Sequence, residues 1–173
     1  FGVAGTHPDP KMDIIAQGSS NSIATNDDWE LAPNLAALRA AFTSSGAFPL
    51  AAGAKDAAAY TTLNSTNVAG YSVRIDSVNS SSSGVVLGEV YDAEPLNSPV
   101  RILNVSTLGF VGSGSAALTP GFYIGGDGSR SVMIRAVGPG LAAFGVGDRL
   151  IDPLVSVVPL GASYVVASND DWS

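Results

Sequence analysis

The stretch DPKMDIIAQGSSNSIATNDDW (Asp9–Trp29) has the pattern of a strand, a tight turn and a second strand, and it recurs as DPLVSVVPLGASYVVASNDDW (Asp152–Trp172). Laid over each other without a gap, so that Phe1 falls on Phe144, the segments 1–30 and 144–173 are identical at 12 of 30 positions. A chance match at this composition gives about two or three identities. The repeat is therefore real, and each copy predicts a β-hairpin.

The repeat has two interpretations. The chain spans one whole period, 1–143, and the opening segment of a second, 144–173. This favours a tandem array, or a polymer whose subunits share elements across their boundaries. The other interpretation is a single protein that happens to contain two similar hairpins. A lone hairpin is marginally stable in water and leaves strand edges open, so a neighbouring unit is expected to cover it by strand addition.

Composition narrows the class of protein. Hydrophobic residues make up 46% of the 173-residue chain and charged residues only 13%, with a net charge of −7. The chain is acidic and its 8 Lys and Arg residues are scattered along the sequence. This argues against a nucleic-acid-binding face, which needs a cluster of Lys and Arg. No apolar run is long enough to span a membrane, and no Cys is present for disulfides or thiolate metal sites. A weakly charged surface suits a protein covered by copies of itself.

Between the two hairpins the sequence predicts one helix and several strands. The helix is PNLAALRAAFTSSG (33–46), with Pro33 in its first turn, Gly46 at its end, and one apolar stripe formed by Leu31, Leu35, Leu38 and Phe42. Strands are expected at 70–78, 85–93, 100–112 and 121–137, with a glycine-rich turn at 125–128. We therefore expect an all-β fold of jelly-roll-like β-sandwich units with one short helix near residues 33–45. The expected units are 1–94 and 100–173, joined by 94–99.

The two Asn-Asp-Asp-Trp turns are the candidate metal sites. Calcium takes six to eight oxygen ligands, and each turn offers three oxygen-bearing side chains in a row: Asn26, Asp27 and Asp28, and Asn169, Asp170 and Asp171. Glu30 adds a carboxylate to the first turn, whereas Ser173 replaces it in the second. The alternative, which the pattern favours, is that Asn and Asp bond to their own backbone while Trp29 anchors the turn in the core.

No constellation of catalytic residues is recognisable. His7 is the sole His, and no Gly-x-Ser-x-Gly elbow accompanies it. Glu89, Asp92 and Glu94 lie on or just after one expected strand, and a glycosidase would need a second carboxylate facing Glu89. We therefore expect a protein that is not an enzyme, in which His7 is a loop residue.

Several stretches together resemble a repeat of large secreted and surface proteins from environmental bacteria of the Verrucomicrobia and Planctomycetes type. They are RILNVSTLGFVGSG (101–114), LTPGFYIGGDGSRSVMIRAVGPGLAAFGV (118–146), GAFPLAAGAKDAAAY (46–60), GYSVRI with GVVLGEVYDA (70–75 and 84–93), and the NDDW turns. Residues 1–30 and 60–93 are also loosely similar to pre-peptidase C-terminal β-sandwich domains. The resemblance implies an exported, extracellular or cell-surface β-domain that scaffolds, displays or adheres, and it implies no catalytic residues.

Two functions are compatible with these observations. The first is a structural repeat or subunit of an extracellular filament or surface fibre, whose partners are copies of itself. The second is a glycan- or surface-binding accessory module of a large secreted protein, whose partner is a cell-surface glycan. Aromatic residues on a flat strand face would favour the second function, and the candidates are Tyr71, Tyr91, Phe122 and Tyr123.

Overall fold

The computed structural model describes residues 3–66, 68, 70–95, 97–112 and 116–171. The chain divides into two compact units, Phe1–Val105 and Ser106–Ser173, called unit 1 and unit 2 below. This division falls after Val105, later than the connection expected at 94–99. The regular structure of the described residues consists of small antiparallel sheets and few helices, and most of it lies in unit 1.

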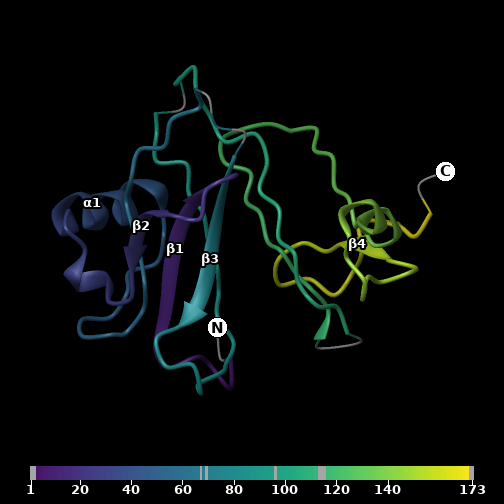
Figure 1. Ribbon diagram of the computed structural model, residues 1–173. Helices are drawn as coiled ribbons and strands as arrows, with labels where there is room; N and C mark the ends of the chain where they lie inside the picture. Colours follow the sequence, from purple (N-terminus) through teal and green to yellow (C-terminus); the bar gives the residue numbers. More distant parts are fainter. Residues whose placement is uncertain (1–2, 67, 69, 96, 113–115, 172–173) are drawn as a thin grey trace. The chain divides into compact units, whose positions relative to one another are not determined.

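Unit 1 is built on a three-stranded antiparallel sheet in the order β2-β1-β3 (Figure 1). Strands β1 (Pro10–Ala16) and β2 (Ser22–Asn26) form the predicted hairpin, with Gly18 in the turn at a φ of 85° that favours glycine. Strand β3 (Tyr71–Ser77) pairs with β1 along its whole length, from Pro10↔Ser77 to Ala16↔Tyr71. The hairpin and the strand expected at 70–78 are confirmed.

The core of unit 1 forms after the hairpin. A short 3-10 helix, η1 (Trp29–Leu31), leads into α1 (Leu35–Ser45), which ends at Gly46 with a φ of 74°. Trp29, Ala32 and Leu38 are buried, with Leu35, Phe42, Leu50 and Ala58 packed against them. The expected stripe is therefore right for three residues and wrong for Leu31, which lies in η1 rather than in α1 and is 75% exposed. Pro33 precedes the helix instead of lying in its first turn.

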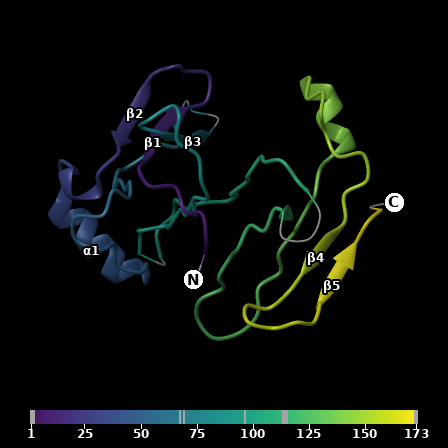
Figure 2. The ribbon, with the colours of Figure 1, turned by 90° about the horizontal axis from the view of Figure 1, so that it is seen from below.

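Unit 2 contains a second antiparallel hairpin, β4 (Val155–Val157) and β5 (Ala167–Asn169), and a 3-10 helix, η3 (Pro139–Phe144) (Figure 2). The strands expected at 85–93, 100–112 and 121–137 are wrong for the described residues. Among them only Val85 makes a bridge, to Thr6, and the rest run without a paired neighbour. Their alternating apolar pattern is that of a strand, but a strand exists only where a second backbone pairs with it. At 125–128 the chain bends, with positive φ at Gly126 and Gly128, but no paired strands flank the bend among the described residues, so the expected hairpin turn is wrong.

No helix in the described part of the chain combines the length and the apolar composition that crossing a membrane would need.

Candidate assembly interface

The first hairpin (residues 10–26) and the second hairpin (residues 153–169) have the same register. Met12↔Asn26 in the first hairpin corresponds to Val155↔Asn169 in the second, and both strands keep the offset that places Phe1 on Phe144. The pairs Asp13↔Thr25 and Ile14↔Ala24 correspond in the same way to Ser156↔Ser168 and Val157↔Ala167. The sequence repeat is therefore also a repeat of strand pairing.

Two hydrogen bonds of the first hairpin recur at the equivalent positions of the second. The amide of Ser19 donates to the carbonyl of Ala16 at 3.0 Å, and the amide of Ala162 donates to the carbonyl of Pro159 at 2.9 Å. At the far ends, Nδ2 of Asn26 donates to the carbonyl of Asp28 at 2.9 Å, and Nδ2 of Asn169 donates to that of Asp171 at 2.8 Å. The local sequence alone is enough to build this hairpin twice.

The first hairpin is held in place by residues that follow it in the chain. Oδ1 of Asn26 accepts a hydrogen bond from the amide of Ala58 at 2.9 Å, and the amide of Trp29 donates to the carbonyl of Asp56 at 2.8 Å. The indole Nε1 of Trp29 donates to the carbonyl of Ala51 at 3.2 Å. Strand β3 thus covers one edge of the hairpin, and the 51–58 segment bonds to Asn26 at the end of β2 and to Trp29 just after it.

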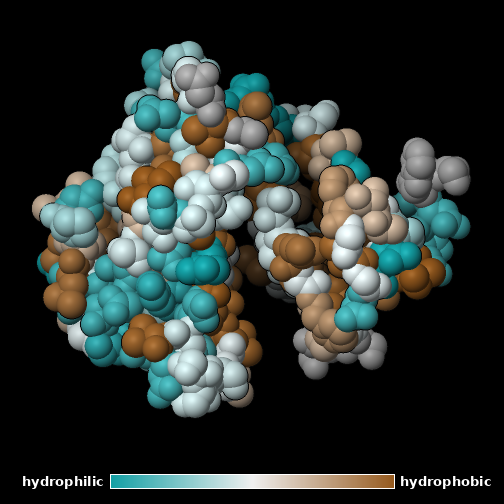
Figure 3. Space-filling model, viewed as in Figure 1, coloured by the Kyte–Doolittle hydropathy of each residue, from teal (hydrophilic) through white to brown (hydrophobic). Residues whose placement is uncertain are grey.

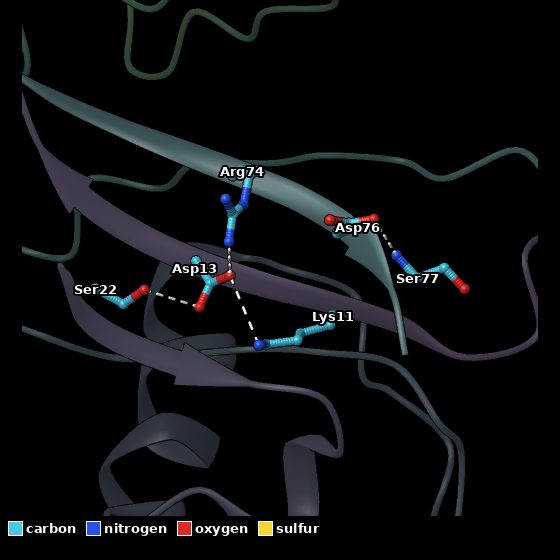
Figure 4. Close-up of polar contacts among 6 residues, drawn as sticks. All are labelled: Lys11, Asp13, Ser22, Arg74, Asp76 and Ser77. Carbon is cyan, nitrogen blue, oxygen red and sulfur yellow. Dashed lines mark hydrogen bonds and ion pairs between the residues drawn. The ribbon is translucent and has the colours of Figure 1, made fainter. Parts of the chain in front are cut away.

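One face of the first hairpin carries a network of ion pairs around Asp13 (Figure 4). Asp13 is only 3% exposed and lies 2.8 Å from the guanidinium of Arg74 and 3.8 Å from the ammonium of Lys11, while Ser22 donates to it at 3.0 Å. The hydrogen bond from Arg74 is the largest of the effects that lower the pKa of Asp13 to about 2, and it outweighs the desolvation that would raise it. Lys11, Asp13 and Arg74 line an open groove of about 480 Å³. Because Asp13 pairs with both cations, the groove presents no free cationic pair for an anionic ligand.

The second hairpin lacks this cover. No strand pairs with the outer edge of β4 among the described residues, and Asn169 makes no contact equivalent to that of Asn26 with Ala58. Its sequence also differs on the face that is polar in the first hairpin: Leu154 replaces Lys11, Ser156 replaces Asp13 and Val165 replaces Ser22. Strands that are apolar on both faces are typical of positions covered from both sides.

Unit 2 as a whole exposes its large apolar side chains. Among its described residues only Gly138 is buried, whereas Tyr123 is 93% and Phe110 is 88% exposed. Figure 3 shows the same feature as brown and tan surface over the part of the chain that carries β4. Exposed apolar side chains that gather into a large patch are typical of interaction surfaces on soluble proteins.

The Asn-Asp-Asp-Trp turn of the first hairpin is occupied by protein contacts. Asp28 forms an ion pair with Lys55 at 2.8 Å, and Glu30 bonds to Arg39 at 3.2 Å and to the amide of Gly53 at 2.8 Å. In the described residues no group of three or more His, Cys, Asp or Glu side chains is placed to hold a metal ion.

The second turn is exposed, and the carboxylate of Asp170 accepts from the amide of Asp171 at 3.0 Å. Trp172, which ends this turn in the sequence, lies outside the described residues. Calcium at the two turns stays a prediction, and in the first turn the geometry favours the alternative, in which Trp29 anchors the turn.

The other residues singled out in the sequence have local partners. Nδ1 of His7 accepts from the amide of Asp9 at 3.1 Å, and the hydroxyl of Tyr91 donates to Glu89 at 3.1 Å. Asp92 accepts from the amides of Glu94 at 3.1 Å and Ile102 at 3.2 Å. None of these contacts places two titratable side chains across a cavity.

Comparison with known proteins identifies no relative: no family model, no curated protein and no solved structure matches the chain. The resemblance to the bacterial surface repeat therefore stays a prediction, and the function has to be argued from the two hairpins and the surface of unit 2.

Proposed function

We propose that this chain is a structural repeat or subunit of an extracellular bacterial filament or surface fibre, and that it has no enzymatic activity. Successive units join by strand and hairpin complementation, so the partners are copies of the chain itself. The observation that carries the proposal is the contrast between two hairpins of identical register, one covered on an edge by β3 and the other uncovered.

Stability arguments support assembly. Folded domains are stable by only about 5–15 kcal/mol, most of it derived from apolar burial. Unit 2 gains little from folding alone, because every large apolar side chain among its described residues is at least partly exposed. Covering these side chains with a neighbouring unit provides the missing burial. We propose that the completed unit is a jelly-roll-like β-sandwich, with the neighbour supplying the second layer over Leu154 and Val158.

Electron microscopy and analytical ultracentrifugation of the purified chain test the proposal. We expect filaments with a regular axial repeat and a sedimentation coefficient that rises with concentration. Replacing Leu154 and Val158 together by Asp should abolish assembly, because two charges would be buried in the contact. The matched control introduces the same two charges elsewhere in the same hairpin, as Ala162→Asp and Ser163→Asp in the turn, and should assemble. Wild-type protein that stays monomeric at all concentrations would rule the proposal out.

A glycan- or surface-binding accessory module is the second candidate, and it is favoured by two neighbouring exposed aromatic residues. Phe122 and Tyr123 are both exposed, and such rings offer flat apolar faces to a sugar. The measurement is retention of the chain on insoluble polysaccharides, compared with a Tyr123→Ala variant. Monomeric protein that binds glycan, with binding lost in Tyr123→Ala, would favour this function over the first.

A further inference from the structure

The first hairpin shows what covers a hairpin of this register, and the second hairpin has the same backbone without the cover. We propose that the second hairpin docks on a second copy of this chain, where it takes the place beside β3 that the first hairpin of that copy holds. This docking rests on the proposed function and deepens it, because it names the strand that receives the hairpin and the register in which the two pair.

The register follows from the pairing of β1 with β3. Met12, Asp13 and Ile14 lie opposite Ile75, Arg74 and Val73 of β3. By the offset of the repeat, the same places in the second hairpin are held by Val155, Ser156 and Val157. In the docked state Val155 therefore lies opposite Ile75 of the second copy, and Ser156 lies opposite its Arg74.

The polar end of the second hairpin, at Asn169, also matches that of the first hairpin, at Asn26. In the first hairpin Oδ1 of Asn26 accepts from the amide of Ala58, while Nδ2 of the same side chain bonds within the turn. Asn169 already makes the equivalent bond within its own turn at 2.8 Å. Its Oδ1 is therefore oriented to accept from Ala58 of the second copy, without a change of side-chain conformation.

The two hairpins differ in charge at the residue opposite Arg74, and this difference decides which hairpin pairs with β3. Asp13 pairs with Arg74 at 2.8 Å, whereas Ser156 brings no carboxylate to that position. Within one chain the first hairpin is therefore favoured, both by the ion pair and by its covalent attachment. The second hairpin has the larger apolar surface to cover, because Leu154 and Val165 replace Lys11 and Ser22. Docking displaces the first hairpin of the acceptor and gives up its ion pair with Arg74, so the burial of Leu154 and Val165 has to offset that cost.

Disulfide trapping tests the docking, and the chain contains no Cys that could interfere. A donor chain with Val155→Cys is mixed with an acceptor chain with Ile75→Cys and mildly oxidised. Directly opposed residues of antiparallel strands have Cα atoms about 4.5–5.5 Å apart, within the range that a disulfide spans. We expect a disulfide-linked heterodimer on a non-reducing gel. The matched control acceptor, Ser72→Cys, lies further along β3 on its opposite face and should give at least about tenfold less.

Two further variants test the register through charge. Ser156→Asp in the donor supplies a carboxylate opposite Arg74 and should raise the heterodimer yield several-fold, although it adds a negative charge to a chain of net charge −7. Ser163→Asp adds the same charge to the turn of the second hairpin, outside its paired strands, and should not raise the yield. Asp13→Ser in the acceptor weakens the resident hairpin and should also raise it. Circular dichroism of each variant checks that the fold is retained.

The outcomes separate this docking from the proposed function. Equal cross-linking at positions 72 and 75, no cross-linking at all, or a lower yield with Ser156→Asp would overturn the docking. If such chains still form filaments, the proposed function stands and only the receiving strand is wrong. If wild-type chains do not assemble and the Val155→Cys and Ile75→Cys chains do not cross-link, both proposals fail.

Discussion

Among the described carboxylates, Asp13 has the pKa that its surroundings shift most. It lies in the middle of β1, 3% exposed, and the guanidinium of Arg74 beside it lowers its pKa to about 2 from an ordinary value of 3.8. A carboxylate with a folded-state pKa below its unfolded value stabilises the fold above the unfolded pKa, and this contribution is lost as the pH falls through the folded pKa. The stabilising contribution of Asp13 is therefore lost between about pH 4 and about pH 2.

Asp13→Asn should lower the urea midpoint of unfolding at neutral pH, because it leaves Arg74 without its ion-pair partner. The gap between wild type and variant should narrow as the pH falls from about 4 towards 2, since the wild-type carboxylate is then protonated as well. Asp76→Asn is the matched control, because Asp76 is exposed on the same face and accepts only from the amide of Ser77. A gap for Asp13→Asn that does not change with pH would contradict this role.

The first Asn-Asp-Asp-Trp turn makes a separate prediction at the residue scale. Its oxygens already accept from Ala58 and Lys55, so binding calcium would require breaking these bonds. We expect the melting temperature of the chain to be the same in a chelator and in excess calcium. A lower melting temperature in the chelator would show that the turn binds calcium after all, and Asp27→Asn should then remove the difference.

Residue roles were predictable from the sequence where the signal is local. Trp29 as the anchor of its turn follows from a large aromatic residue placed directly after a strand end. The network of Asp13 and Arg74 was missed, because the two residues are 61 positions apart and only the pairing of β1 with β3 brings them together. The sequence offered two signals of this network: a single carboxylate, Asp13, in an apolar strand, and an arginine, Arg74, in another strand of the same length.

At the scale of elements, the stability of α1 should depend on the side chains of its buried face only. Leu38 is 2% exposed in the core with Trp29, whereas Leu31 is 75% exposed just before the helix. Leu38→Ala should lower the free energy of unfolding by about 2–5 kcal/mol. Leu31→Ala, the same substitution at an exposed position, should stay within about 0.5 kcal/mol of wild type. Urea unfolding followed by tryptophan fluorescence measures both, and similar losses in the two variants would contradict the assigned core.

Elements were predicted correctly where their signals lie close together in the sequence. The hairpin turn needs a glycine at positive φ, and the end of α1 needs Gly46 in the same region, so both could be read from the chain. The strands expected at 100–112 and 121–137 have the right alternation, but pairing depends on a partner strand that alternation cannot reveal. The same limit applies to the sandwich, which needs a second layer in addition to the described sheets.

At the scale of the whole molecule, hydrogen exchange distinguishes a covered hairpin from an uncovered one. In the second hairpin the amide of Val166 donates to the carbonyl of Val157, so Val157 faces β5, and by alternation Ser156 and Val158 direct their backbone groups to the open edge. In a dilute sample these two amides should exchange rapidly. In β1 the equivalent amides, those of Asp13 and Ile15, lie on the edge paired with β3 and should exchange slowly.

If assembly covers the second hairpin, the amides of Ser156 and Val158 should slow by at least about tenfold in filaments, which corresponds to about 1.4 kcal/mol of added protection. The amides of Asp13 and Ile15 in β1 should exchange faster in filaments, because the docked second hairpin takes the place of β1 beside β3. Protection that appears at Phe122 and Tyr123 while Ser156 stays unprotected would place the contact elsewhere on unit 2. Such a result would keep self-assembly and reject the hairpin as its means, because a strand edge that remains open to solvent cannot be what joins one copy to the next.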